Sequence, residues 1–456
     1  MSECHTDALL GVFNRIASMK HPVLFLLALG VVVRLAIMST SMVYDLDYWA
    51  VVIRNIEAGN GLYEAEGYYY TPIWGYILGI ISVLQDYVLC LGETAVRVVD
   101  AFFVEYIPET YYTATAPSIA FVYSIKIPLM IFDVIVAFLA MAIVKDFTGD
   151  QRKAVVAFAL TFLSPVLFLS SSMIAMPDTI AVMFSLLTIL LLRRGCPFIA
   201  GMTFSLAVLT KFFPAFLIFI FVAFLFMKNR GRPSDSIRQV LMAAAGALLI
   251  AVVSLLPYII DGNVLQCFQF LSDRVAISDD DSIMHVIIST SRVLVYAAVL
   301  ILSIAVAVLM FRNKINDPYE LMLKGCLLVA TLCMVYPPTT QYLVIIVPFL
   351  AIWISSRDSR FIYSWMILFV GSLIYVYASN SLTLMPLAAW TDVVSMDSVL
   401  DIFKWTNATM VGPISLRSLQ FLVGGTIQCL GVLSILYIMF EDKIRVFLHR
   451  RVDTSI

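Results

Sequence analysis

Residues 119–144 read IAFVYSIKIPLMIFDVIVAFLAMAIV, an apolar run with only two charged side chains, Lys126 and Asp133. A helix of this length, at about 1.5 Å per residue, can cross the hydrocarbon core of a bilayer, which is about 30 Å thick. A single segment inside lipid satisfies its backbone hydrogen bonds only as a helix. The run therefore predicts a transmembrane helix, and many other stretches of the chain repeat the pattern.

The composition predicts an all-α polytopic membrane protein. Of the 456 residues, 61% are hydrophobic and 13% are charged, and the mean hydropathy is +0.96. The apolar runs are continuous, unlike the alternating segments of a β-barrel. The seven cysteines form no Cys-x-x-Cys motif, so we expect neither disulfides nor a metal site. The first 21 residues carry no small-residue cleavage signal, so the run after them is expected to remain a span.

Charged breaks in the hydropathy pattern divide the apolar sequence into about twelve candidate spans. Several are short enough to be tilted or paired half-helices. The candidate spans cover residues 22–43, 119–144, 153–173, 177–193, 197–211, 213–228, 238–260, 285–311, 320–337, 341–356, 360–379 and 417–440.

Basic residues cluster in every second loop between these candidate spans. Lysine and arginine near span ends collect on the cytosolic side of membranes. Both termini are therefore predicted to be cytosolic, on the side of the basic clusters at 145–153, 193–194, 228–238, 312–324, 357–360 and 443–451.

Residues 72–90 are also apolar, but a full span there would put the later basic loops outside. We therefore predict a re-entrant or interfacial helix that begins at Pro72. This makes residues 44–118 one large external loop within a single domain that covers residues 1–456.

The stretch DYWAVVIRNIEAG in this loop places Trp49, Ile53 and Ile56 on one helical face. Such a face predicts a helix that lies on the membrane surface. The same loop is rich in acidic and aromatic residues.

Asp45 and Asp47 stand just after the first predicted span, in YDLDYW at 44–49. A carboxylate at the membrane edge suits a general base that removes a proton from an acceptor hydroxyl, and aromatic rings nearby suit the faces of a sugar. The alternative is an N-cap for the amphipathic helix plus one solvated acid. Spacing alone leaves both interpretations open.

Charged groups at or inside a membrane are costly, so each needs a reason. Lys211, in AVLTKFFPAFLIF, lies where two short spans meet on the external side, and it either binds a lipid phosphate or extends to the interface. Lys126 and Asp133 either form an internal polar pair or line a cavity. Asp178, in the external hairpin SSSMIAMPDTIAV, either caps the next helix or takes part in chemistry.

Further polar residues are predicted on the same external side. Gln341 and Tyr342 lie in the hairpin YPPTTQYLVIIVPFL, and Tyr70 follows the acidic part of the first loop. Arg274 lies in a second external loop, 261–284.

One stretch resembles a known family. Residues 43–76, VYDLDYWAVVIRNIEAGNGLYEAEGYYYTPIWGY, resemble the first luminal loop of the catalytic subunits of GPI mannosyltransferase I. That family carries an acid-x-acid motif after its first span, followed by Gly-x-x-x-Tyr and Tyr-x-Tyr-Thr-Pro. The matching elements here are Asp45 to Asp47, Gly59 to Tyr63 and Tyr68 to Pro72.

The match continues in the same order along the chain. Bacterial polyprenol-phosphate-mannose-dependent mannosyltransferases share the acid-aromatic loop and the Lys-x-x-Pro element. MPDT around Asp178 replaces the family's Asn-Ala-Glu-type element, and residues 86–117 look inserted. The similar segments are SIKIPLMIFDVIVAFL at 124–139, LTKFFP at 209–214 and TTQYLVIIVP at 339–348.

The resemblance implies a GT-C glycosyltransferase, a helical membrane enzyme that takes a hexose from a polyprenyl- or dolichyl-phosphate sugar with inversion at the external or luminal face. For such an enzyme we expect Asp45 or Asp47 to act as the base and Lys211 to hold the leaving phosphate, with Lys126 and Arg274 as the next candidates. Two acids so close could instead hold a divalent ion, but the resemblance points to a metal-independent enzyme, so we expect no metal and no cofactor. Other expected substrate contacts are Gln341, Tyr342, Tyr70 and Asp178.

The sequence itself fits a lipid-borne donor, since it shows no glycine-rich phosphate loop and no soluble nucleotide-binding domain. It leaves open the acceptor, which is a lipid-linked or cell-surface glycan or a glycolipid, and whether a small membrane subunit accompanies the chain. No nucleic-acid partner is expected. The C-terminal VDTSI shows no retrieval signal, which favours the plasma membrane of a prokaryote, such as an archaeon, over the endoplasmic reticulum.

Two other functional classes stay open at this point. A transporter or flippase of an amphiphile would also use buried charges. Against it, no inverted repeat is visible, and the polar groups gather on one side, whereas alternating access needs a site at the midplane. A non-catalytic membrane scaffold would leave the acids of YDLDYW without a role.

Overall fold

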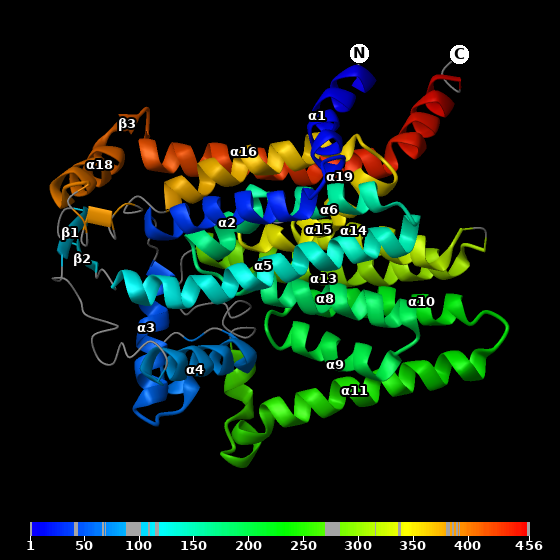
Figure 1. Cartoon of the computed structure of the whole chain (residues 1–456), viewed down its shortest axis with the longest axis horizontal. Coiled ribbons are helices and arrows are strands. Elements are labelled where there is room, and N and C mark those ends of the chain that lie inside the picture. Colours follow the sequence, from blue (N-terminus) through cyan, green and yellow to red (C-terminus); the bar gives the residue numbers. More distant parts are fainter. Residues whose placement is uncertain are drawn as a thin grey trace.

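The computed structural model is a bundle of helices, most of which run along the long axis of the molecule (Figure 1). Six helices among the described residues are long and apolar enough to cross a membrane, or seven if the bent pair at 151–173 counts as one span. They are α2 (Pro22–Thr40), α5 (Ile119–Thr148), α11 (Pro233–Ile260), α13 (Ile283–Arg312), α16 (Phe361–Ser379) and α19 (Leu416–Asp453). The structure describes residues 2–40, 44–65, 68, 70–87, 102–107, 110–114, 118–269, 283–314, 316–335, 339–379, 384, 387, 388, 391 and 393–453.

Shorter helices fill the space between these long ones. All twelve predicted segments coincide with helices, so a polytopic helical membrane protein is confirmed, whereas twelve membrane crossings stay a prediction. The shorter helices are α6 (Gln151–Phe162), α7 (Pro165–Phe168), the π-helix η3 (Leu169–Met173), α8 (Asp178–Arg194), α9 (Pro197–Val208), η4 (Phe213–Leu217), α10 (Ile218–Lys228), η5 (Val264–Phe268), α14 (Pro318–Cys333), η6 (Tyr342–Ile345) and α15 (Ile346–Ser356).

Glycine and proline set the helix ends near the loop that joins α8 to α9. Gly195 ends α8 with a φ of 79°, in the left-handed region that glycine adopts without steric cost. Pro197 then opens α9, because its missing N–H is not needed in a first turn. The chain reverses within these few residues, so α8 and α9 pack side by side.

The basic loops meet at one end of the bundle. Lys228 Nζ donates to the carbonyls of Leu192 and Arg193 at 3.0 and 3.1 Å. Arg193 in turn pairs with Asp146 at 3.5 Å, and Arg357 pairs with Glu320 at 2.7 Å. Loops that are far apart in sequence therefore share this end, which we call the basic end.

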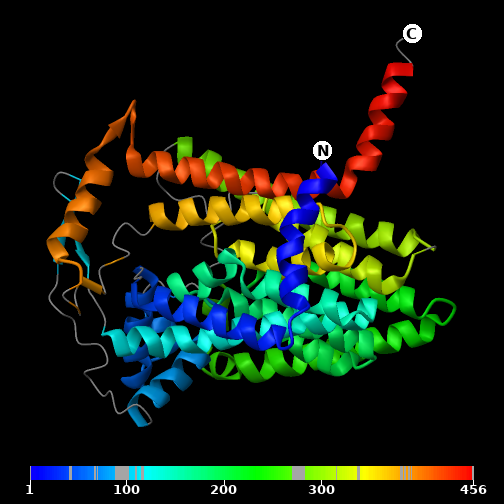
Figure 2. The same cartoon turned by 45° about the horizontal axis from the view of Figure 1, so that its top comes forward.

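Further contacts connect the basic end to α13 and to the last helix, α19. Arg230 donates to the carbonyl of Phe311, and Arg360 bonds both Asp358 and Glu441 of α19. Burial acts to raise the pKa of Asp358, but the hydrogen bonds and charge of Arg360 outweigh it and lower that pKa. The two chain termini also lie toward this end (Figures 1 and 2).

The opposite end carries α3 (Tyr44–Glu57), η1 (Leu62–Glu64) and α4 (Pro72–Tyr87). In Figure 1, α3 crosses the ends of the long helices roughly at right angles to them. Helix α4 begins at Pro72 as predicted. The backbone N–H of Ile73 donates to the carbonyl of Leu209 at 3.3 Å, which fixes the start of α4 beside the turn after α9.

The apolar face of α3 was predicted to lie on the membrane, and this is wrong for its central residues. Trp49 and Ile53 are buried against protein side chains, and Ile56 is partly buried. Burying one tryptophan removes about 150–250 Å² from contact with solvent or lipid. The face that the sequence shows is therefore a packing face within the protein.

Several smaller elements depart from the all-α expectation. Among the described residues, β1 (Phe102–Ile107) pairs with β2 (Thr110–Ala114), and β3 (Met410–Val411) pairs with β4 (Ile414–Ser415), each antiparallel. A further helix, α18 (Met396–Ala408), lies with them at the end of the bundle near α3 (Figure 1). At the basic end the chain starts with α1 (Ser2–Ala17).

Candidate functional site

An ion pair between Lys211 and Asp178 forms the centre of the site. Lys211 lies in the turn between α9 and η4, and its Nζ is 3.6 Å from Asp178 Oδ2. The Asp178 side chain is fully buried, and that of Lys211 is 12% exposed. Capping of α8 by Asp178 is wrong, because Pro177 occupies the N-cap and Asp178 is the first helical residue. The carboxylate instead holds the lysine of another hairpin.

Two tyrosine rings flank the ammonium group. Lys211 Nζ lies 4.0 Å from the ring centroid of Tyr70 and 5.4 Å from that of Tyr342. Cation–π contacts of this kind stabilise a cation by about 0.5–2 kcal/mol, more where water is excluded. The predicted residues Lys211, Asp178, Tyr70 and Tyr342 therefore come together from four separate segments.

Neighbouring hydrogen bonds hold the backbone segments that carry both tyrosines. Burial raises the pKa of the Tyr63 hydroxyl, which stays protonated and donates to the carbonyl of Tyr70 at 2.9 Å. On the other side, Gln428 Nε2 of α19 donates to Thr340 Oγ1 at 2.8 Å. This bond holds the segment that carries the half-buried Gln341 and then Tyr342.

The depth of the site follows from the helix lengths. Helix α8 runs 17 residues from Asp178 to Arg194 at the basic end. At about 1.5 Å per residue this is about 25 Å, a few ångströms less than the hydrocarbon thickness of a bilayer. Lys211 and Asp178 therefore lie at the end of the bundle away from the basic loops.

Trp49 connects α3 to this ion pair. Its Nε1 donates to the carbonyl of Ala175 at 3.0 Å, and its ring lies 5.2 Å from that of Tyr70. Ala175 has a φ of 55°, and it is the one non-glycine residue with positive φ in the described part of the chain. Such a conformation costs about 1–2 kcal/mol and persists only where the surroundings hold it.

Tyr70 adds a second contact to the same hairpin. Its hydroxyl donates to Met176 Sδ at 3.4 Å. Ala175 and Met176 lie three and two residues before Asp178. The rings of Trp49 and Tyr70 therefore contact the same hairpin that carries one member of the ion pair. The role of Trp49 was missed in the sequence, where its spacing indicated only an apolar face.

The backbone of α3 gives the two acids different positions. Asp45 lies four residues before the buried Trp49, whereas Asp47 lies four residues before Val51, which is 42% exposed. Residues four apart share a helix face, so the position of Asp45 shares a face with Trp49 and the position of Asp47 shares one with Val51. The side chains of both acids, and all of Arg274, lie outside the described part of the structure.

The sequence suggested that Lys126 and Asp133 either pair with each other or line a cavity. They do not pair with each other. Lys126 is fully buried, and its Nζ donates to the carbonyl of Met38 at 3.3 Å. Asp133 pairs with Arg34 of α2 at 3.0 Å, and it accepts a hydrogen bond from Ser171 at 2.6 Å. The sequence did not indicate this pairing, because 99 residues separate its partners.

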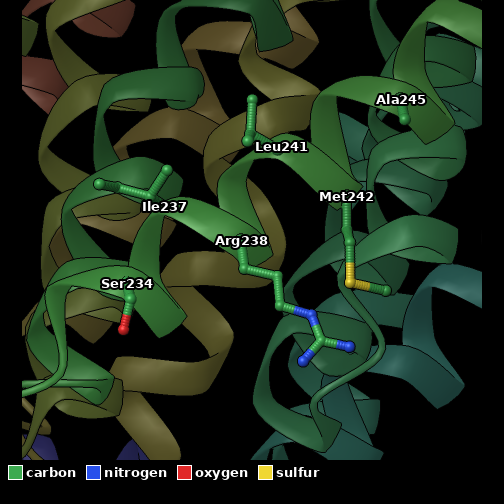
Figure 3. A pocket seen from close by; sticks show the side chains of 6 residues that line it. All are labelled: Ser234, Ile237, Arg238, Leu241, Met242 and Ala245. Atoms are coloured by element: carbon green, nitrogen blue, oxygen red, sulfur yellow. The ribbon is translucent and has the colours of Figure 1, made fainter.

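A shallow apolar groove lies on α11 (Figure 3). Ser254, later on the same helix, accepts a hydrogen bond from Tyr76 of α4 at 2.7 Å. About 24 Å of helix separates that serine from Arg238, so the groove lies toward the basic end. The groove is lined by Ser234, Ile237, Arg238, Leu241, Met242 and Ala245, none of which was a predicted site residue.

No protein-family model matches this chain, and a search of curated proteins finds no match to it. The chemistry of the site is therefore argued from its residues and their contacts.

Proposed function

We propose that this chain is a membrane glycosyltransferase that moves a hexose from a polyprenyl- or dolichyl-phosphate sugar to a glycan or glycolipid acceptor. Mannose is the sugar that the resemblance of the first loop favours. The observation that carries the proposal is the bond from Trp49 to Ala175, which ties the helix of Asp45 and Asp47 to the hairpin of Asp178, whose carboxylate pairs with Lys211 of another hairpin. Sugar transfer from a lipid phosphate needs a general base and a cation that binds the phosphate, held near each other.

Lys211 is proposed to hold the phosphate of the donor. Its ammonium lies beside one carboxylate and two rings, and 12% of the side chain is exposed, so we propose that a phosphate oxygen reaches it from that exposed side. Contacts between a lysine and a phosphate are charge-assisted and about twice as strong as neutral hydrogen bonds. Asp178 holds the ammonium in place through the ion pair.

Asp45 is proposed as the general base, in preference to Asp47, because its position in α3 is one helical turn before Trp49, which contacts the hairpin of Asp178. Its carboxylate takes the proton of the acceptor hydroxyl as that oxygen bonds to the anomeric carbon. The bond from the anomeric carbon to the phosphate oxygen breaks, and both electrons leave with the polyprenyl phosphate. Attack from the face opposite the phosphate inverts the anomeric centre.

The depth of the site supports a donor that arrives within the bilayer. The positive-inside rule would place the basic end in the cytosol and the site on the external or luminal side. A prenyl chain in the outer leaflet brings its phosphate to about the level of Lys211. The acceptor then approaches from the aqueous side, where α3 crosses the bundle.

The test uses purified full-length protein with dolichyl-phosphate [³H]mannose and membrane lipids as acceptor. We expect the wild type to transfer sugar and Asp45→Asn to lose about 10²–10⁴-fold in rate. Asp47→Asn is the matched control, with a rate within about tenfold of the wild type. Unchanged transfer by Asp45→Asn would overturn the base assignment, and absence of transfer from any polyprenyl-phosphate hexose would overturn the function.

A transporter is the second candidate, because the buried pair of Arg34 and Asp133 is the kind of group that transport pathways use. The contacts of Arg34 favour a structural role instead. Its Nε, Nη1 and Nη2 donate to Asp133, Gly30 and Phe162, so its donors are directed at protein acceptors.

A further inference from the structure

The pair of Arg34 and Asp133 lies beneath the hairpin that carries the ion pair of the site. Arg34 Nη2 donates to the carbonyl of Phe162 at 2.8 Å, and its guanidinium carbon lies 4.0 Å from the ring centroid of that residue. Phe162 ends α6, and helix ends leave carbonyls without an intrahelical donor. Arg34 therefore satisfies the backbone at the point where the chain bends by 42° into α7 and η3.

Asp133 holds the next part of the same segment. Its Oδ2 accepts from Arg34 and also from the hydroxyl of Ser171, the central residue of the π-helix η3. Both charged side chains and the serine are fully buried. Single π-helical turns cost backbone stability and frequently lie at functional sites, so a buried ionic contact directed at one needs a reason beyond packing.

The carbonyls of the π-helix η3 accept hydrogen bonds from the backbone of the hairpin that follows it. The N–H of Met176 donates to the carbonyl of Ser170 at 2.9 Å, and the N–H of Ile174 donates to that of Leu169 at 2.9 Å. These bonds set the left-handed Ala175, whose carbonyl then faces Trp49. Asp178 follows within three residues, opposite Lys211.

We infer that Asp133 is a positioning residue, which acts with Arg34 through Ser171 to fix the hairpin at 174–178. The buried ionic group contacts the start of this segment through Ser171, and Trp49 and Tyr70 contact its end at Ala175 and Met176. Its position sets the carboxylate of Asp178 beside Lys211 and the anchor point of α3 at Ala175. The catalytic consequence rests on the proposed function, whereas the mechanical coupling does not.

The test removes one hydroxyl and leaves the ion pair intact. Ser171→Ala deletes the link between Asp133 and the π-helix. Ser185→Ala is the matched control, because Ser185 is equally buried but bonds only the carbonyl of Ala181 in its own helix at 2.8 Å. Ser171→Thr keeps the hydroxyl and serves as the conservative rescue.

Hydrogen–deuterium exchange of the hairpin is the first readout. We expect the peptide over 174–180 to exchange about fivefold faster in Ser171→Ala than in wild type, because one supporting hydrogen bond is lost. Ser185→Ala and Ser171→Thr should match the wild type there. Equal exchange in Ser171→Ala and Ser185→Ala would overturn the inference, whatever the activity.

Transfer kinetics are the second readout. We expect kcat of Ser171→Ala to fall about tenfold, with KM for the donor changed less than about threefold, because a displaced Asp178 weakens contacts that matter most as phosphate charge develops. Faster exchange with an unchanged kcat would overturn the catalytic part of the inference. Faster exchange in Ser171→Ala, together with no sugar transfer by the wild type, would support the coupling and overturn the proposed function.

Discussion

Replacing Trp49 by phenylalanine should separate the two halves of the site without removing any of its charges. The change deletes the hydrogen bond to the carbonyl of Ala175 and leaves that buried oxygen without the indole donor. An unsatisfied buried acceptor costs about 1–3 kcal/mol, and the smaller ring leaves a cavity that costs about another 1–2 kcal/mol. We therefore expect about 2–5 kcal/mol of lost stability, concentrated at the hairpin.

Trp365→Phe is the matched control for this change. Trp365 Nε1 also donates to a backbone carbonyl, that of Leu160, at 3.1 Å, but it lies on α16 away from Lys211. Both variants should lower the thermal melting temperature in the same detergent. Only Trp49→Phe should lower kcat, by about tenfold or more, since about 1.4 kcal/mol of misplaced transition-state contacts is a tenfold loss.

The assay is sugar transfer at equal fractions of folded protein, measured below the melting temperature of both variants. A similar loss of activity in the two variants would mean that transfer follows general stability. Full activity in Trp49→Phe would refute the idea that the bond to Ala175 joins the two halves of the site.

Three further predictions concern the charge, the packing and the orientation. Lys211→Met should weaken binding of polyprenyl phosphate about 10- to 100-fold, because a charge-assisted contact is lost; unchanged affinity in a binding titration would exclude this lysine from the phosphate site. Gly246→Val should unfold the protein at lower temperature, since a Cβ there would lie 2.0 Å from the Phe198 carbonyl oxygen, whereas Gly425→Val, with no atom within 4 Å of its Cβ, should change the melting temperature little. The exposed Cys196 at the basic end should react with a membrane-impermeant maleimide only from the cytosolic side, and labelling from outside would reverse the proposed orientation.

The sequence predicted the helices and singled out both members of the ion pair, though not their pairing, because apolar runs and isolated charges leave local signals. Long apolar runs and proline or glycine at their ends locate the helices, as at Pro72 and Gly195. Lys211 and Asp178 were conspicuous because a charge beside an apolar run is costly and so calls for a partner. Their convergence with Tyr70 followed from placing all the hairpins at one end.

The links that join these parts were not visible in the sequence. Arg34 is one more charge in an apolar run, and nothing in its surroundings indicates a partner on another helix 99 residues away. Trp49 looked like a membrane anchor because amphipathic spacing is the same whether the apolar face meets lipid or protein. The left-handed Ala175 had no signal at all, since the residue usually chosen for that conformation is glycine.

The position of a bound donor tests the central claim most directly. In a structure with a polyprenyl-phosphate hexose, we expect a phosphate oxygen within about 4 Å of Lys211 Nζ and the anomeric carbon on the side of α3 that carries Asp45. A phosphate bound instead at the basic end, for example near Arg238, would contradict the account.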